Sequence, residues 1–593
     1  MRLFLSLLAI SIVTQIAVSQ STETAAPNCD VNLATQLVRQ QVRESSTITA
    51  NDKQIRILIR SADFLWKYDE QAARDFFADA FKRAEAEHEK AGDGSKARDG
   101  FDARFREQVP DHRMDVIRAV AKHDAKWADQ LIARVIDEYK KNLGEAGSKF
   151  REREIDALLG IAIAVAANDR DLARTIFRRV MAFPLTMMMG AAISSISQTD
   201  KELSDSLYVE ALARYRDERP RRLLFLSAYP FAQGRIMGID KFQFGFSIPV
   251  DMEPNKPLQR LIIETFLGRV ARFAANQSDL ALPPETPYKP EPLYLVTGLN
   301  DIEPIVISEF PDLLDRLAAA RSQALALLDA EMRKTLESSG NHVEQLSMSL
   351  DERIAAAIEA DKAGKLTDEM IIQLITWGEA SEEQLAKIQP FLDKIKDEKA
   401  KKEASAFFWF KRGLRSVKDE RFDDAEKHAE RIGDLELKAY VYFELADKTA
   451  RSANDQAAKF EILNKLSKVI RAAPDSVVKA QMLLGLSGKY GELNHTIALD
   501  EISESIKVVN KLKDPDLLSN FVMKQIATKD MAFFASYSIP GFDLERAFGD
   551  LSKRDMDMAL AHARSFDDRF FRTLAVIAIA KQCVAAPKPQ TAI

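Results

Sequence analysis

Cysteine is scarce in this sequence: among its 593 residues, only Cys29 and Cys583 are cysteines. This excludes a disulfide-dense scaffold, so we expect stability to come from packing. The two cysteines stand near opposite ends of the chain, and a bond between them needs Cα atoms within about 7 Å of each other. An open array of helices would not supply that closeness. Free thiols are therefore the simpler expectation, and a Cys29–Cys583 bond is the alternative.

Glycine and proline are also scarce. The chain has 22 glycines and 21 prolines, about 7% of its residues against roughly 12% in an average protein. Turns are therefore few, and helices must be long or closely joined. Eleven prolines fall between residues 229 and 311, so that stretch cannot be one continuous helix. We expect an irregular insertion there, with a helix over 257–267 and short strands at 294–296 or 305–307.

Long apolar runs are absent except at the N-terminus. Arg2 precedes an almost wholly apolar run from Leu3 to Val18, and Ala17-Val18-Ser19 presents small side chains at the positions that a signal peptidase reads. The run is too short for a membrane anchor. We expect export to the periplasm or the exterior, cleavage between Ser19 and Gln20, and no stable membrane insertion afterwards.

Charge of one sign is not concentrated anywhere. Lys and Arg number 84 and Asp and Glu number 90, which gives a net charge of -6, and the two signs are interspersed. A nucleic-acid-binding protein carries a basic patch or stripe. We therefore expect no nucleic acid among the partners.

A recurring aspartate marks the starts of helices. It follows an apolar, Ala-rich segment and precedes two mostly polar residues and then a hydrophobic one. An aspartate in this place accepts hydrogen bonds from backbone N–H groups of the first helical turn, and its charge suits the helix dipole. The spacing predicts helical hairpins in a degenerate array, with second helices that begin after Asp69, Asp124, Asp169, Asp200, Asp514 and Asp555.

One stretch resembles a known repeat. Trp409-Phe410-Lys411-Arg412-Gly413, followed by Phe422 and Ala425, is similar to the tetratricopeptide pattern W-x2-L-G-x2-Y then A-x3-F, although Arg412 stands in the Leu place. The resemblance covers residues 405 to 510. It implies stacked antiparallel helix pairs, as in tetratricopeptide and HEAT-like α-solenoids, and it brings no catalytic residue with it.

These observations predict an all-α fold, a degenerate α-solenoid of antiparallel helical hairpins with a Pro-rich irregular insertion. The predicted segments are a signal peptide over 1–19, an N-terminal helical array over 20–228, the insertion over 229–311, a helical connector with a charged segment over 312–404, and a tetratricopeptide-like array over 405–593.

No complete catalytic, cofactor or metal motif is present. The seven histidines include no H-E-x-x-H, and His112 and His123 lie eleven residues apart, about 16 Å along a helix. Met181 and Met187 to Met189 could suit Cu(I), but methionine more often fills gaps in cores. We therefore expect no catalytic residue, no cofactor and no metal.

Two features keep other functions open. Glu337-Ser338 resembles the Glu-Ser pair of lytic transglycosylases, but the Gly-Leu-Met-Gln-like segment of that family does not follow it. Arg216, Arg219, Arg221 and Arg222 could bind an acidic partner, although the neighbouring Asp217 and Glu218 favour a solvated turn.

The function predicted from the sequence is binding. We expect an exported, non-enzymatic scaffold whose solenoid surface recognises a protein or a peptide. The Pro-rich insertion should contribute to recognition, because prolines limit the flexibility of a loop and so lower the entropy lost when it docks. The alternative is a cell-wall or polysaccharide-acting enzyme on a helical superhelix or toroid. Two or more carboxylates in one cleft would distinguish the enzyme from the scaffold.

Overall fold

The structure is a computed structural model. It describes residues 30–91, 111–143, 152–232, 236–238, 252–276, 290–336, 349–378, 380–449, 455–518, 521–528, 532–539 and 541–585. These residues divide into two compact units. The terminal unit is drawn from Met1–Gln41, Lys438–Met523 and Ser536–Ile593, and the central unit from Val42–Leu437 and Lys524–Ala535.

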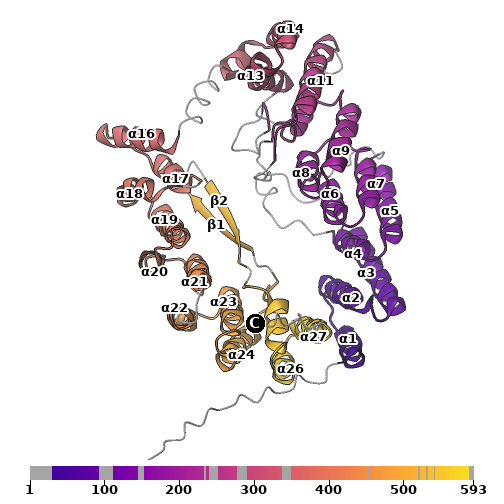
Figure 1. Cartoon of the computed structure of the whole chain (residues 1–593), viewed down its shortest axis with the longest axis vertical. Helices are drawn as coiled ribbons and strands as arrows, with labels where there is room; N and C mark the ends of the chain where they lie inside the picture. The colour runs from indigo at the N-terminus through magenta and orange to yellow at the C-terminus, as the bar shows by residue number, and fades with distance from the viewer. Residues whose placement is uncertain are drawn as a thin grey trace, which may run out of the picture. The chain divides into compact units, whose positions relative to one another are not determined.

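The fold is all-α, as the sequence predicts (Figure 1). The unit boundary crosses α1 (Val31–Ser45). The helices of the central unit that follow α1 are α2 (Asn51–Leu65), α3 (Glu70–Ala91), α4 (His112–Ala121), α5 (Ala125–Leu143), α6 (Glu152–Ala166), α7 (Arg170–Val180), α8 (Met187–Ile196), α9 (Lys201–Arg214), α10 (Pro220–Leu223) and the 3-10 helix η2 (Leu224–Leu226).

The central unit continues with α11 (Lys256–Ala275), α13 (Glu291–Glu309), η3 (Pro311–Leu313), α14 (Leu314–Ala326), α16 (Leu350–Lys362), α17 (Asp368–Thr376), α18 (Glu382–Ile388), η4 (Gln389–Lys394), α19 (Glu398–Lys418) and α20 (Phe422–Glu430). The unit boundary crosses α21 (Leu435–Thr449). The terminal unit then has α22 (Asp455–Ala472), α23 (Val477–Tyr490), α24 (His495–Lys511), α25 (Leu544–Ser552), α26 (Met556–Arg564) and α27 (Arg569–Cys583).

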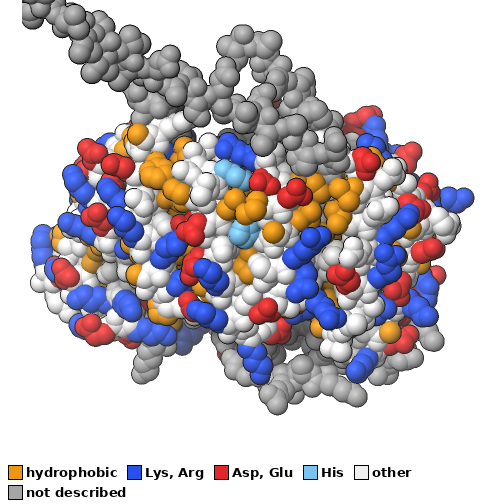
Figure 2. Space-filling model, turned by 90° about the horizontal axis from the view of Figure 1, so that it is seen from below, with side chains coloured by type: hydrophobic (Ala, Val, Ile, Leu, Met, Phe, Trp, Pro, Cys, Tyr) orange, Lys and Arg blue, Asp and Glu red, His pale blue; other side chains and the backbone are white. Residues whose placement is uncertain are grey.

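Consecutive helices pack as pairs, and the pairs stack. Helix α2 packs on α3, α4 on α5, and α6 on α7, while α2, α4, α6 and α8 also contact one another in succession. Contacts between neighbouring pairs join residues 32 apart: Arg178 Nε donates to Glu210 Oε2 at 2.7 Å, and the Tyr215 hydroxyl donates to the Phe183 carbonyl at 2.9 Å. Charged side chains of both signs are interspersed on the face shown in Figure 2.

The recurring aspartate is a helix N-cap at five of its six predicted positions. The carboxylate accepts a hydrogen bond from the backbone N–H three residues later, at 2.8 Å for both Asp169 and Asp200, 2.9 Å for both Asp124 and Asp555, and 3.2 Å for Asp69. The prediction is confirmed there because a cap depends on local chain alone.

The prediction of a helix after Asp514 is wrong. Asp514 has a positive φ of 47°, and the chain goes on to a two-stranded β-ribbon of β1 (Phe521–Ala527) and β2 (Ala532–Ser538). The Asp516 carboxylate accepts from Leu518 N at 2.9 Å, a local turn that competes with a helix start. Aromatic residues in both strands and the β-branched Val522 and Ile526 of β1 favour extended chain.

The insertion is more helical than expected. Helix α11 covers the predicted helix over 257–267, but the predicted strands are wrong because both segments lie in α13. Prolines occupy the first turns of both helices, where a missing N–H costs little. A Cβ on Gly298 of α13 would lie 2.7 Å from the Phe266 ring of α11, so this glycine permits close packing inside the core.

The expectation of free thiols is also wrong. Cys583 is disulfide-bonded, and Cys29, the one other cysteine of the sequence, lies outside the described residues. The physical reason is that the terminal unit contains both ends of the chain. In it the Thr573 hydroxyl of α27 donates to Gln41 Oε1 of α1 at 3.4 Å.

Two further features bear on the sequence predictions. Met181 and Met189 are buried in the core, in keeping with a packing role. Within the described chain, no helix combines the length and the apolar composition that crossing a bilayer requires.

Candidate functional site

The tip of the β-ribbon lies against helices of the central unit (Figure 1). Lys524 Nζ donates to Asp434 Oδ2 at 2.6 Å and also to the Glu436 carboxylate. The Thr528 hydroxyl donates to Glu369 Oε1 at 2.8 Å. On β2, Phe533 packs edge-on against Phe407 of α19, with ring centroids 5.7 Å apart. We call Glu369, Phe407, Asp434 and Glu436 the ribbon face.

The carboxylates of the ribbon face belong to the first turns of two helices. Asp434 caps α21, accepting from Leu437 N at 3.0 Å, and Glu436 follows in the first turn. Glu369 lies in the first turn of α17. Carboxylates are favoured at helix N-termini because the helix dipole is positive there. The same preference that starts these helices therefore supplies the negative charge that meets the ribbon.

The electrostatics of the ribbon face favour charged side chains. Burial alone would lower the pKa of Lys524, but hydrogen bonds from its ammonium to Asp434 and Glu436 outweigh burial and raise the pKa. The pKa of Glu369 is lowered by its own backbone N–H and by the Thr528 hydroxyl. The lysine and this glutamate are therefore ionised near neutral pH.

Lys411 fixes α19 against the end of α17. Its ammonium donates to the backbone carbonyls of Ile375 at 3.1 Å, Gly378 at 2.8 Å and Trp377. These carbonyls have no partner further along the helix, so the lysine takes the place of a C-cap. Burial lowers the pKa of Lys411 to about 8.

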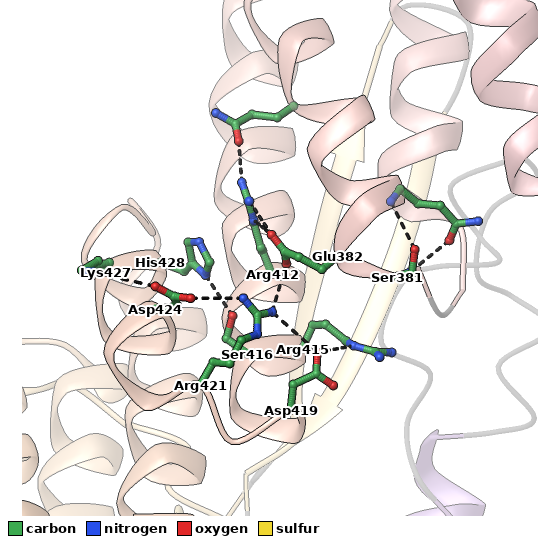
Figure 3. Close-up of polar contacts among 12 residues, drawn as sticks. Ser381, Glu382, Arg412, Arg415, Ser416, Asp419, Arg421, Asp424, Lys427 and His428 are labelled. Atoms are coloured by element: carbon green, nitrogen blue, oxygen red, sulfur yellow. Dashed lines mark hydrogen bonds and ion pairs between the residues drawn. The ribbon is translucent and has the colours of Figure 1, made fainter.

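A network of ion pairs ties α18, α19 and α20 together (Figure 3). Glu382 of α18 accepts from Arg412 Nε at 2.8 Å and from Arg421 Nη2 at 3.3 Å. Arg421 also donates to Asp424 Oδ2 at 3.2 Å and lies 3.6 Å from the Asp419 carboxylate. The network fixes α19, which carries Phe407, against α18 and α20. Its arginines and carboxylates pair with one another.

Residues of the tetratricopeptide-like stretch pack between α19 and α20. The Trp409 ring stacks on His428 of α20 with centroids 5.6 Å apart, and the Arg431 guanidinium lies 4.6 Å from the Trp409 ring centroid. Burial lowers the pKa of His428, and its Nδ1 lies 3.2 Å from the Ser416 hydroxyl oxygen (Figure 3). The tryptophan joins α19 to α20, and both of its neighbours hold it in place.

A second surface is an open groove of about 640 Å³ between α9 and the start of α11. Asp205, Val209 and Glu210 line one side, and Asn255 and Leu258 line the other. The Asp205 carboxylate accepts from the Tyr229 hydroxyl at 2.7 Å. Burial and then this contact raise the pKa of Tyr229 above its ordinary range. The groove belongs in part to the predicted insertion, since Asn255 and Leu258 come from it. Asp205 and Glu210 place two carboxylates in it, the feature that the enzyme alternative requires. Arg178 donates to both Glu210 oxygens and lowers the pKa of this carboxyl, which disfavours its use as a general acid.

A buried cluster of polar side chains occupies the junction of α3, α4, α5 and α6. His88, Asp111 and Glu154 bring potential ligand atoms within 4.8 Å of one another. Arg113 donates to both Asp111 oxygens, at 2.9 Å from Nε and 2.7 Å from Nη2, and to Glu138 Oε2 at 2.7 Å. Burial alone would raise the pKa of Asp111, but Arg113 outweighs it and lowers the pKa.

The residues singled out in the sequence do not converge on one site. Arg216 pairs with Asp217 at 3.1 Å, and Arg222 donates to the Leu185 carbonyl at 2.8 Å. Glu337 and Ser338 lie outside the described residues. The sequence reasoning missed the ribbon face entirely, although the aromatic residues of β2 offered a signal for extended chain.

No protein-family model matches the chain, and no curated protein is significantly similar to it.

Proposed function

We propose that this chain is an exported protein, cleaved between Ser19 and Gln20, whose helical array binds proteins or peptides without catalysing a reaction. One observation carries the proposal. The ribbon face holds an extended segment whose hydrogen-bonding residues lie 88 to 159 residues away in the sequence. The array thereby binds, within its own chain, the kind of extended segment that we propose it binds in a partner.

The contacts define the chemistry of the partner segment. Asp434 and Glu436 accept from one ammonium, Glu369 accepts from a hydroxyl, and Phe407 packs against an aromatic ring. An isolated two-stranded ribbon is marginally stable in water, so the helices supply much of the stability of the tip. We propose that a partner segment with a basic and an aromatic side chain displaces the tip and takes its contacts.

The resemblance to tetratricopeptide repeats supports the same proposal. Trp409 and Gly413 lie on α19, and Phe422 and Ala425 lie on α20. We propose that these two helices form one tetratricopeptide-like pair. Such repeats usually present an extended surface to a protein or peptide ligand, and α19 contributes Phe407 to the ribbon face.

A binding measurement tests the proposal. In one variant, residues 524–535 are replaced by a short Gly-Ser linker, which exposes the ribbon face. A labelled peptide with the sequence of residues 521–538 should bind this variant at least tenfold more tightly than it binds the intact protein. Adding Glu436→Gln to the linker variant should weaken binding, because the ammonium of the peptide loses one carboxylate.

The controls separate recognition from non-specific adhesion. A peptide with Lys524→Ala should bind the linker variant less tightly than the parent peptide does. Equal binding of both peptides, or equal binding by the intact protein and the linker variant, would refute the proposed role of the ribbon face. The export step is tested by N-terminal sequencing of secreted material, and a mature chain that retained residues 3–18 would contradict it.

A further inference from the structure

The cluster at the junction of α3 to α6 combines one imidazole with several carboxylates. His88 lies near the C-terminal end of α3, Asp111 caps α4, and Glu154 lies in the first turn of α6. The side chains of His88 and Asp111 are 15% and 12% exposed, and Glu154 is 9% exposed. Three helices thus direct nitrogen and oxygen ligands into one sheltered place.

The cluster offers the ligand types that a transition-metal ion prefers. Asp111, Glu138 and Glu154 are acidic, and Arg113 pairs with the first two. Imidazole nitrogen and carboxylate oxygen are both ligands of Zn²⁺ in proteins.

The imidazole has a different neighbour on each ring nitrogen. Nδ1 of His88 lies 3.8 Å from Asp111 Oδ2, and Nε2 lies 3.6 Å from Glu138 Oε1. A histidine that binds a metal through one nitrogen commonly donates its other N–H to a carboxylate, which fixes the ring. Nδ1 lies on the side of Asp111, and at 3.6 Å the Nε2–H comes within hydrogen-bonding distance of Glu138 after a small rotation of the ring.

We propose that His88, Asp111 and Glu154 form a Zn²⁺ site, with Glu138 as the outer partner of the imidazole. Zn²⁺ binds imidazole nitrogen and carboxylate oxygen at about 2.0–2.2 Å, and a fourth position can hold water. Asp111 can serve Arg113 and the metal together, because an ionised carboxylate has about four lone-pair sites. Ligand atoms 2.1 Å from a tetrahedral metal lie about 3.4 Å apart, so small rotations of His88 and Glu154 complete the geometry.

The experiment uses the untagged mature chain after removal of metals by a chelator. Isothermal titration with Zn²⁺ should show one site with a dissociation constant in the micromolar range or tighter. His88→Ala should weaken binding at least tenfold, and Glu154→Gln should do the same. Glu138→Gln should weaken it by about tenfold, the usual effect of losing an outer-shell partner. Titration with Co²⁺ should give the visible absorption of a tetrahedral ion, and His88→Ala should remove it.

A matched histidine provides the control. His123 pairs with a single carboxylate, its Nε2 lying 3.0 Å from Asp63 Oδ1, and it stacks on Trp66. His123→Ala should leave Zn²⁺ binding unchanged, and circular dichroism should confirm that all variants are folded. The proposal is overturned if the intact chain binds no Zn²⁺ when the ion is present at about 100 μM. That concentration is about a hundred times the micromolar dissociation constant that we expect for the site. An equal loss in His123→Ala, or binding of Ca²⁺ alone, would overturn it as well.

Discussion

Lys524→Met should loosen the ribbon tip from the ribbon face. Methionine keeps an unbranched stem of similar length but removes the ammonium that Asp434 and Glu436 share. The side chains of these three residues are 20%, 30% and 18% exposed. These side chains are less exposed than those of a surface ion pair, which is worth about 0–1 kcal/mol, and more exposed than a buried pair. Breaking a buried pair costs about 3–5 kcal/mol because it leaves an unpaired charge. We expect the free energy that opposes opening of the tip to fall by about 2 kcal/mol.

Amide hydrogen exchange measures this opening directly, because the strand amides exchange when the tip separates locally. A loss of 2 kcal/mol corresponds to exchange about 30-fold faster in the strands, since each 1.4 kcal/mol is a factor of ten. Lys489→Met is the matched control: this lysine pairs with Asp447 in the terminal unit and should leave the exchange of the tip unchanged. Lys524→Arg should keep most of the protection because it keeps the charge. Unaltered exchange in Lys524→Met would refute the assignment of the ribbon face.

The pH dependence of this contact has a definite sign. Folding raises the pKa of Lys524, so the folded state holds the proton more tightly than the unfolded state does. The resulting stabilisation is complete below about pH 10, where the lysine is charged in both states. It is lost as the pH rises through the raised value.

Three further predictions concern stability. Asp169→Ala should cost about 1 kcal/mol through loss of the N-cap of α7, and an unchanged urea midpoint would show that the cap does not matter. Glu382→Gln should cost about 1 kcal/mol because Glu382 joins two arginines, whereas Glu383→Gln, at a fully exposed position, should leave the midpoint unchanged. Cys583→Ser should cost about 4 kcal/mol, since the bond closes a very long loop; in thermal unfolding it should lower the midpoint as much as a reductant does, and an unshifted midpoint would contradict the bond.

The elements that the sequence predicts well depend on neighbouring residues. The aspartate caps are confirmed because the carboxylate and the N–H that it accepts from lie three residues apart. Helix α11 is confirmed because its apolar stripe and its first-turn proline lie within one segment. At Asp514 the same local signal fails, because a turn at Asp516 and the strand-forming residues that follow outweigh one capping aspartate.

The sites escaped prediction because they join distant residues. Thr528 meets Glu369 across 159 residues, and no periodicity in a single sequence places them together. The histidine cluster has the same origin. His88, Asp111 and Glu154 are 23 and 43 residues apart in succession, spacings that match no metal motif. Cys583 likewise gave no local sign of its partner, because the pairing depends on both chain ends belonging to one unit.

The predicted role of the Pro-rich insertion in binding can now be tested without removing a core element. Replacing residues 270–311 would delete α13, in which Leu295, Leu299 and Val306 are fully buried, so loss of function would report only unfolding. The groove between α9 and α11 offers a milder change. Val209 is an exposed apolar side chain, 44% accessible, on its wall.

Val209→Asp should therefore keep the helical circular dichroism, because an exposed position tolerates a charge at a cost within about 0.5 kcal/mol. If a partner uses the groove, the added carboxylate beside Asp205 and Glu210 should reduce the number of partners recovered by cross-linking. Val469→Asp is the matched control, since Val469 is a similarly exposed valine, 42% accessible, on α22 of the terminal unit. If both variants retain the same partners, the insertion contributes only to packing of the core. The ribbon face is then the surface to test for partner binding.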